Sequence, residues 1–173
     1  MPNPYLLLAA LLLFTACATD PTTLDEPEVT TNEETDTDTE EETAPTEVLD
    51  LVNAQRRTGC VCGATPYPAA PPLDLHPALT AAAALHATDQ ADHNNMSHTG
   101  SDGSTMGQRL SRQGYRWRTV GENVARGYRS EAAVVAGWFA SEGHCRNMMN
   151  ENYRHLGYGR DRGFFTMLLA APR

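Results

Sequence analysis

Residues 134–150, VVAGWFASEGHCRNMMN, place an apolar segment directly before a short stretch rich in reactive side chains. Ser130 is a preferred residue for capping a helix, so we predict a helix from there through the apolar part. The following GHCRNMMN is predicted as a turn or a short helix. Glu142, just before it, together with His144 and Cys145 is compatible with a cysteine nucleophile, a metal site or a structural cysteine.

Outward from this stretch, the sequence pattern predicts further helices, with the strands concentrated near the C-terminus. The segment 115–129 lacks a helical period, and 59–75 reads as a proline-rich loop. The predicted elements are helices over 46–57 (capped by Thr46), 77–94 and 105–113 (capped by Ser104), and strands over 155–160 and 164–171 joined by a hairpin at 161–163.

Residues 1–17 are predicted to be a signal peptide. The apolar run at 5–16, YLLLAALLLFTA, has 12 residues, whereas a helix that crosses a membrane needs about 20. The run matches the apolar core of a secretory signal. It ends in FTAC, which resembles a bacterial lipobox and predicts lipidation and membrane anchoring at Cys17. Cleavage by an ordinary signal peptidase is the alternative. We therefore expect an exported protein, either lipid-anchored to the bacterial cell envelope or secreted.

Residues 18–46 are predicted to be a disordered acidic linker before a folded domain over 47–173. The segment 18–47 holds 12 Asp or Glu residues and no basic residue, so its charges repel and little remains to form a core. Residues 48–173 carry all 13 basic residues, every one an arginine, and 10 acidic residues, which gives a formal charge of about +3. These arginines are scattered, so we expect no nucleic-acid partner. We also expect the protein to be a monomer.

Four motifs in the folded part occur in the order seen in one protein family. The motifs are SHTGSDGSTMGQRL (97–110), GENVARG (121–127), VVAGWFASEGHCRNMMN (134–150) and HLGYGRDRGFFTMLL (155–169). They resemble the bacterial branch of the CAP superfamily, whose SCP domain is shared by cysteine-rich secretory proteins, antigen 5 and plant pathogenesis-related proteins. The resemblance implies an α+β fold, a three-layer α/β/α sandwich with a central, mainly antiparallel sheet.

The resemblance also implies a cleft lined by two histidines and one or two glutamates. Matched motif by motif, His98 is the first histidine, Glu122 the glutamate and His144 the second histidine. Imidazole and carboxylate groups suit a divalent metal such as Zn²⁺, so these three are the candidate metal ligands and catalytic groups. A hydrogen-bonded cluster without metal is the alternative. Glu142 lies one residue beyond the place of a second family glutamate, so we do not assign it that role. Met167 replaces a frequent glutamine, which predicts a more apolar cleft.

The family commonly has arginine after the GH pair, where this chain has Cys145. If 143–150 is helical, His144 points about 100° away from Cys145 and cannot serve as its base, so a disulfide fits better. Cys60 and Cys62 are too close in sequence to pair easily with each other. We therefore expect Cys145 to bond Cys62, with Cys60 as the alternative partner.

The resemblance fixes no single reaction, because one fold can serve unrelated functions. We expect an extracellular binding module for a lipid, another small apolar ligand or an envelope component. The alternative is a peptidase-like, metal-dependent hydrolase in which Glu122 activates a metal-bound water. A third hypothesis is an envelope interaction domain without catalysis. The sequence contains no self-sufficient catalytic motif. Outside the motifs, His76, His86, His93 and His155 are predicted to be surface or hydrogen-bonded residues, and Asn123 and Asn147 to bond backbone groups in turns.

Overall fold

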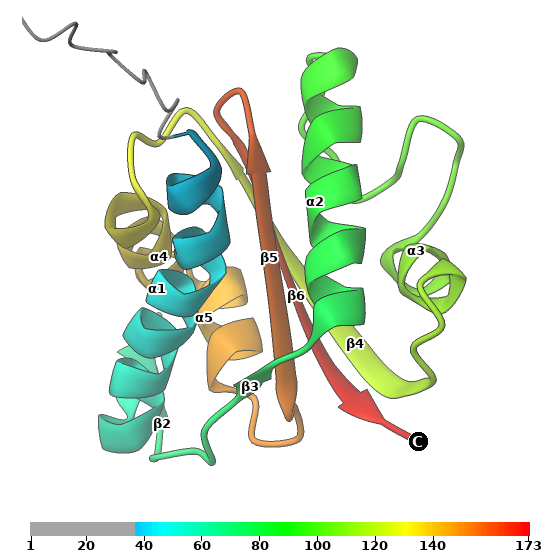
Figure 1. The fold of residues 1–173 in the computed structure, drawn as a ribbon. Coiled ribbons are helices and arrows are strands. Elements are labelled where there is room, and N and C mark those ends of the chain that lie inside the picture. Colours follow the sequence, from blue (N-terminus) through cyan, green and yellow to red (C-terminus); the bar gives the residue numbers. More distant parts are fainter. Residues whose placement is uncertain (1–36) are drawn as a thin grey trace, which may run out of the picture. The chain divides into compact units, whose positions relative to one another are not determined.

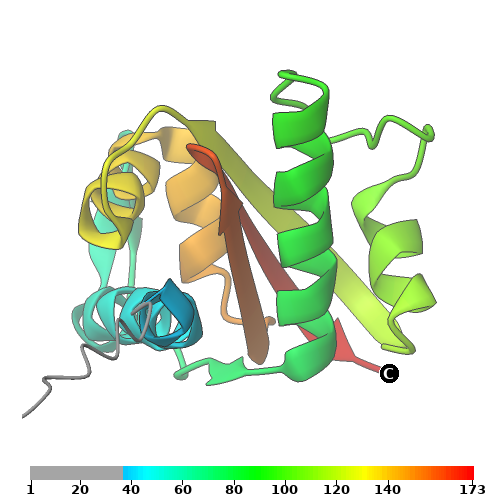
Figure 2. The ribbon, with the colours of Figure 1, turned by 45° about the horizontal axis from the view of Figure 1, so that its top comes forward.

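The computed structural model describes residues 37–173, which form three layers, with helices on both faces of a sheet (Figures 1 and 2). The main sheet has the order β3-β5-β6-β4, in which β3 is parallel to β5 and the other neighbours are antiparallel. The predicted fold class is thus confirmed. The elements are α1 (Thr37–Thr58), β1 (Cys60–Cys62), β2 (Thr65–Tyr67), β3 (Asp74–Leu75), α2 (Pro77–Asp92), α3 (Met106–Arg112), β4 (Trp117–Arg126), α4 (Glu131–Ala140), α5 (Glu142–Met149), β5 (His155–Asp161) and β6 (Phe164–Pro172).

An apolar core lies on each face of the sheet, because β6 is buried on both sides. Phe165, Met167 and Leu169 contact the core beneath α1 and α4. Leu168 and Ala170, which alternate with them along the strand, contact the core beneath α2 and α3. Helices α1, α4 and α5 therefore cover one face, and α2 and α3 cover the other (Figure 2). Burial on both faces explains the continuous apolar run of this strand.

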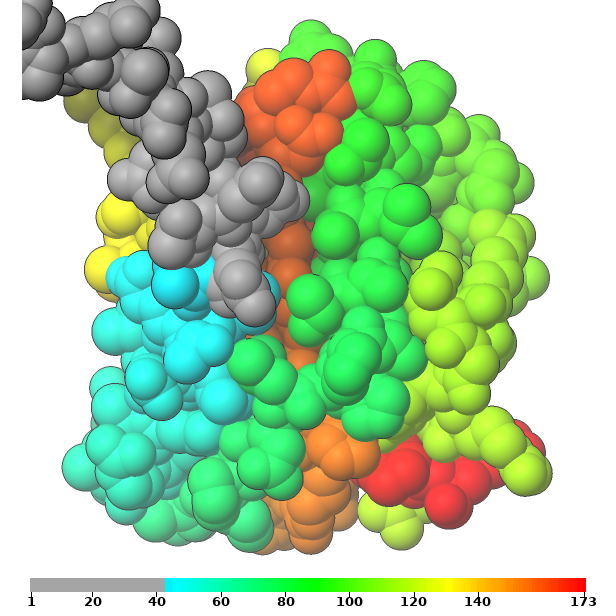
Figure 3. All heavy atoms as spheres, in the orientation of Figure 1, coloured from blue at the N-terminus to red at the C-terminus, as the bar shows by residue number. Residues whose placement is uncertain are grey.

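Helix α2 packs directly on β5, which is visible between α1 and α2 in the space-filling view (Figure 3). Two glycines of β5 permit this close approach. A Cβ at Gly157 would overlap the backbone of Leu79, and a Cβ at Gly159 would overlap the backbone of Ala84. The β5–β6 hairpin was predicted, and it turns at Arg162 and Gly163, whose φ angles are 44° and 79°.

Two predictions about irregular segments were wrong. Residues 59–75 contain the β1–β2 hairpin and β3 in place of a continuous loop. These strands have only two or three residues, too few for a periodic pattern to appear. Residues 115–129 contain β4, the longest strand in the described part of the chain. Its first residues are partly exposed and its last are almost all buried, so it shows no simple alternation of polar and apolar residues.

One of the three predicted helix caps was correct. Thr46, the predicted cap of the first helix, lies inside α1 and caps nothing. The Ser130 hydroxyl accepts a hydrogen bond from the Ala133 N–H and caps α4 as expected. Helix α3 is capped by Thr105 and not by Ser104. The Thr105 hydroxyl accepts from the Gln108 N–H, while the Gln108 side chain accepts from the Thr105 N–H. This reciprocal pair satisfies two backbone donors, which decides between the two neighbouring candidates.

Helix α1 begins at Thr37, before the predicted start at Thr46, so the last part of the predicted linker 18–46 is helical. The buried residues Ala44, Val48 and Val52 are spaced four apart and pack on the core, which explains the longer helix. The remainder of the predicted linker, the predicted signal peptide and Cys17 lie outside the described residues. Among residues 37–173, no helix has the length and apolar character needed to cross a membrane.

A disulfide joins Cys62 of β1 to Cys145 of α5, with a Cα–Cα distance of 5.5 Å. The predicted pairing is thus confirmed, and Cys60 carries a free thiol. The bridge ties the β1–β2 hairpin to the helix that carries His144. Both bridged cysteines are fully buried.

Candidate functional site

Glu122 is a fully buried glutamate on β4, and both of its carboxylate oxygens are engaged. Oε1 accepts a hydrogen bond from His98 Nδ1 at 2.9 Å. Oε2 accepts one from Arg109 Nη2 at 2.6 Å. The Glu122 side chain is 0% exposed, and that of Arg109 is 8% exposed. Such burial is tolerated because the carboxylate has both a counter-charge and hydrogen bonds.

Arg109 connects three parts of this site from α3. Its Nη1 donates to the Ser104 carbonyl at 2.8 Å, and its Nη2 donates to the His98 carbonyl at 3.2 Å as well as to Glu122. One guanidinium group therefore fixes the loop before α3 and the loop that carries His98. The fixed, planar arrangement of its donors makes arginine well suited to this role.

His98 lies on the loop between α2 and α3, and α2 holds this loop in place. His86 Nε2 donates to the Ser97 carbonyl at 2.8 Å, and Gln90 Oε1 accepts from the Ser97 N–H at 3.2 Å. The His98 side chain is 52% exposed. Because Nδ1 donates to a carboxylate, Nε2 of His98 is left as a free nitrogen. The hydrogen bond to Glu122 raises the pKa of His98.

His144 lies on α5, which amide side chains connect to β4. Asn123 Nδ2 donates to the His144 carbonyl at 3.2 Å. Asn147 Nδ2 donates to the Glu122 carbonyl at 3.2 Å and to Asn123 Oδ1 at 2.9 Å. Both asparagines are structural, but they join two elements that are distant in sequence and do not stabilise local turns. Burial, and then the charge of His98, lowers the pKa of His144, which favours its neutral form.

The three predicted metal ligands do not come together as one ligand set in the described structure. Within the described residues, no group of three histidine or carboxylate side chains brings its ligand atoms within 4.8 Å of one another. Glu122 is bound to His98 Nδ1, which is how a carboxylate orients a metal-binding imidazole. Glu122 is therefore placed to orient His98 and not to act as a third ligand beside the two histidines.

Comparison of the sequence with known protein families identifies the family of this chain. The model of CAP, the cysteine-rich secretory protein family, matches residues 49–164. This chain belongs to the CAP family. Two Bacillus subtilis relatives are the uncharacterized membrane protein YlbC, 36% identical over 81 residues, and the uncharacterized protein YkwD, 30% identical over 112 residues. These alignments cover 47% and 65% of this chain, but only 23% and 40% of the relatives.

Solved structures show the same CAP fold. An extracellular protein with an SCP domain from Bacillus anthracis is 29% identical with a TM-score of 0.66, and the match covers 75% of this chain and 41% of that one. An outer surface protein from Borrelia burgdorferi is 19% identical with a TM-score of 0.60, covering 74% of this chain and 89% of that one. At that identity the second likeness shows the fold alone.

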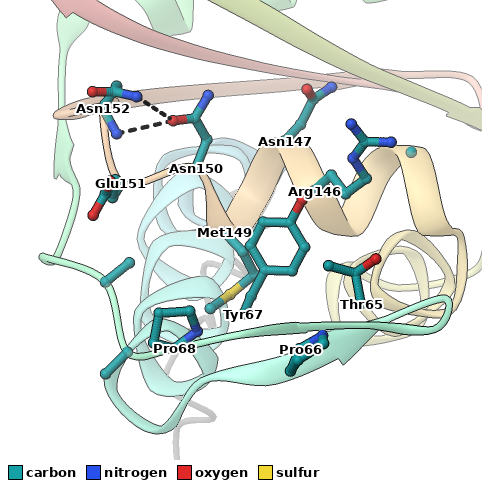
Figure 4. A pocket seen from close by; sticks show the side chains of 13 residues that line it. Thr65, Pro66, Tyr67, Pro68, Arg146, Asn147, Met149, Asn150, Glu151 and Asn152 are labelled. Atoms are coloured by element: carbon teal, nitrogen blue, oxygen red, sulfur yellow. Dashed lines mark hydrogen bonds between the residues drawn. The ribbon is translucent and has the colours of Figure 1, made fainter.

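Two pockets of the CAP domain are lined by residues of α2, α3 and α5. One of about 250 Å³ lies between α2 and α3, next to His86 and Arg109. Another of about 580 Å³ lies between the β1–β2 side of the domain and α5, where Tyr67 and Pro68 face Arg146 across the opening (Figure 4). Neither pocket is lined by His98 or His144, so the histidine pair is a separate feature of the surface.

Glu142 and Met167 were considered as cleft residues from the sequence. In the structure, both lie away from Glu122 and its partners. The Glu142 carboxylate lies against Gly63 in the β1–β2 turn, 3.9 Å from Arg146, and the side chain is 56% exposed. It takes no part in the contacts around Glu122. Met167 is fully buried in the core beneath α1 and α4.

Sequence reasoning missed two residues that build the CAP-domain site. Arg109 was quoted within a motif but received no role, and the buried His86 was grouped with surface or hydrogen-bonded histidines. Arg109 and Glu122 lie on separate elements, so their pairing cannot be predicted from their spacing in the sequence. The prediction of surface or hydrogen-bonded histidines is confirmed for all four, His86 included: His86 bonds the Ser97 carbonyl, His76 accepts from the Ala78 N–H, His93 bonds the Asp89 carbonyl, and His155 bonds the Tyr115 hydroxyl.

We expect the free energy of unfolding to decrease as the pH falls below about 6.5, the ordinary pKa of histidine. Burial is the main cause that lowers the pKa of His86 and of His155. Their stabilising contribution is therefore present above that pH and is lost as the pH falls through their folded pKa values, because the unfolded chain binds protons more readily. His98, with its raised pKa, acts in the opposite direction.

Urea unfolding at about pH 7.5 and about pH 5.5 measures this dependence across the histidine range. His86→Gln keeps a donor for the Ser97 carbonyl but cannot ionise, so its loss of stability between the two pH values should be smaller. An equal loss in the wild type and in His86→Gln would contradict the role given to His86.

Proposed function

We propose that this CAP domain is an exported binding domain that holds an elongated apolar ligand, such as an acyl chain, in a groove between α1 and α4. The groove carries the proposal, because six of its seven lining residues are apolar. Its volume of about 520 Å³ is within the range of small-molecule sites. The lining residues are Leu51, Ala54, Gln55, Ala132, Val135, Ala136 and Phe139.

Export is supported by two independent features. The N-terminal sequence has the apolar run and the lipobox-like Cys17 of a lipoprotein signal. Similar structures include an extracellular protein and an outer surface protein. A domain anchored to a membrane through a lipidated cysteine would meet acyl chains at high local concentration, which suits an apolar groove.

Ala136→Glu is expected to weaken the binding of an acyl ligand by about tenfold or more. A carboxylate in the groove would remove about two methylene groups from apolar contact, at about 0.8 kcal/mol each, and about 1.4 kcal/mol corresponds to a factor of ten. Titration of the full chain with a fluorescent fatty acid measures the affinity. The matched control is Ala133→Glu, which changes an exposed residue of the same helix outside the groove. Equal affinities in the two variants, or no binding by the wild type, would reject the groove.

A second candidate function is metal-dependent hydrolysis at the histidine pair. One observation favours it: the pKa of His98 is raised and that of His144 is lowered, and paired groups with opposite shifts are typical of acid–base chemistry. A bound Zn²⁺ would supply a water of lowered pKa. Glu122 is poorly placed to act as the base, because His98 and Arg109 occupy both of its oxygens. We therefore assign Glu122 the task of orienting His98, and we rank hydrolysis second.

A further inference from the structure

A free thiol lies beside the disulfide that joins β1 to α5. The Sγ atom of Cys60 is 3.6 Å from the Sγ of Cys145 and 3.8 Å from the Sγ of Cys62. Residues two apart in a strand point to the same side, so β1 directs Cys60 and Cys62 together toward Cys145. The three sulfurs share one small apolar cluster with Tyr67 and Met149.

We propose that the three cysteines form a thiol–disulfide exchange site, in which the bridge moves between Cys62–Cys145 and Cys60–Cys145. In the forward step the Cys60 thiolate attacks Cys145 Sγ, the Cys60–Cys145 bond forms and the Cys62–Cys145 bond breaks. Cys62 leaves as a thiolate and takes up the proton that Cys60 lost. The step is an isomerisation, so it consumes no oxidant and no reductant.

The geometry sets the conditions for this exchange. Because its distances to the two bridged sulfurs are nearly equal, the Cys60 thiol lies beside the bond, and a change of its side-chain rotamer precedes attack. Cys60 is partly exposed, which leaves room for that rotation. Burial raises the pKa of Cys60, so its thiolate is scarce at neutral pH and exchange accelerates as the pH rises.

The exchange changes which thiol is accessible. Cys145 is bridged in both states, so α5 and its His144 stay tied to β1. In the first state the free thiol is that of Cys60, which reaches the surface. In the second state it is that of Cys62, which is fully buried. The site therefore switches the domain between a form that offers a thiol to other thiols and disulfides and a form that hides it.

Peptide mapping of the full chain with Cys17→Ser, which leaves only these three cysteines, tests the proposal. The protein is equilibrated between about pH 7 and about pH 9, around the ordinary thiol pKa, and then quenched with acid. Because Cys60 and Cys62 lie on one peptide, fragmentation in tandem mass spectrometry locates the bridge. We expect the Cys60–Cys145 peptide in roughly 0.1–10% of molecules, as for a minor state a few kcal/mol above the major one. It should form about ten times faster for each pH unit. Finding only the Cys62–Cys145 peptide at every pH would overturn the proposal.

Two serine variants in the same background sharpen the test. Cys62→Ser removes the native partner, and the protein should then contain a Cys60–Cys145 bridge and no free thiol. Cys60→Ser is the matched control, and it should keep the Cys62–Cys145 bridge at every pH with no second species. A folded Cys62→Ser protein with two free thiols would also overturn the proposal. If that variant does not fold, the peptide map of the parent decides alone.

Discussion

Arg109→Ala is expected to lower the free energy of unfolding by about 3–5 kcal/mol, because it leaves a buried carboxylate without its counter-charge. Glu122 is fully buried, and Arg109 Nη2 is 2.6 Å from its Oε2. The substitution also removes the hydrogen bonds that Arg109 donates to the Ser104 and His98 carbonyls, so the loop that carries His98 is held by fewer contacts. Urea unfolding followed by tryptophan fluorescence measures the change.

Arg112→Ala is the matched control, since it removes a neighbouring arginine of α3 whose ion pair with Asp102 is also 2.6 Å long but exposed. Solvent screens exposed ion pairs, so its effect should be small. The double variant Arg109→Met, Glu122→Leu should recover much of the loss, because apolar replacement of a buried ion pair is often neutral. Equal effects of Arg109→Ala and Arg112→Ala would contradict the central place given to the buried pair.

Cys145→Ser is expected to lower the free energy of unfolding by about 2–5 kcal/mol, because it removes the bridge to β1 under either pairing. The bridged residues are 83 apart in sequence. In the chain-entropy model, a closed loop of that length stabilises the folded state by about 4–5 kcal/mol, which is the upper expectation. The same urea measurement under non-reducing conditions applies.

Cys60→Ser is the control for this prediction, because it leaves the bridge of the major state intact and removes only a free thiol. Its unfolding free energy should fall much less than that of Cys145→Ser, because the bridge remains and the thiol that is removed is only partly buried. A loss of similar size in Cys60→Ser and Cys145→Ser would show that the cysteine cluster stabilises by packing and not through the bridge.

The elements predicted correctly from sequence are those whose signals are local. The hydroxyl of Ser130 caps α4 within three residues, and the Arg162–Gly163 turn sets the hairpin between its own two strands. β4 was missed because it is defined by pairing with β6, from Trp117 opposite Pro172 to Arg126 opposite Phe164, and those partners are far along the chain. Two adjacent hydroxyls at 104 and 105 could each cap α3, and only the reciprocal bond to Gln108 distinguishes them.

The candidate site was predicted through the family resemblance and not from spacing. His98, Glu122 and His144 are separated by 24 and 22 positions, which no local rule would group. The resemblance implied that Glu122 is a ligand or a base, whereas in the structure its two oxygens accept hydrogen bonds from His98 and Arg109. That difference follows from the buried ion pair, which only the packing of α3 against β4 creates.

Whether the domain binds or catalyses is tested most directly by screening the full chain against peptide and ester libraries, with and without zinc. His98→Ala and His144→Ala are screened beside the wild type and titrated with the fluorescent fatty acid. Neither histidine lines the groove between α1 and α4, so we predict the same acyl affinity in all three proteins. For a binding domain we also predict no turnover by any of them. Zinc-dependent turnover by the wild type that both substitutions abolish would contradict the binding function.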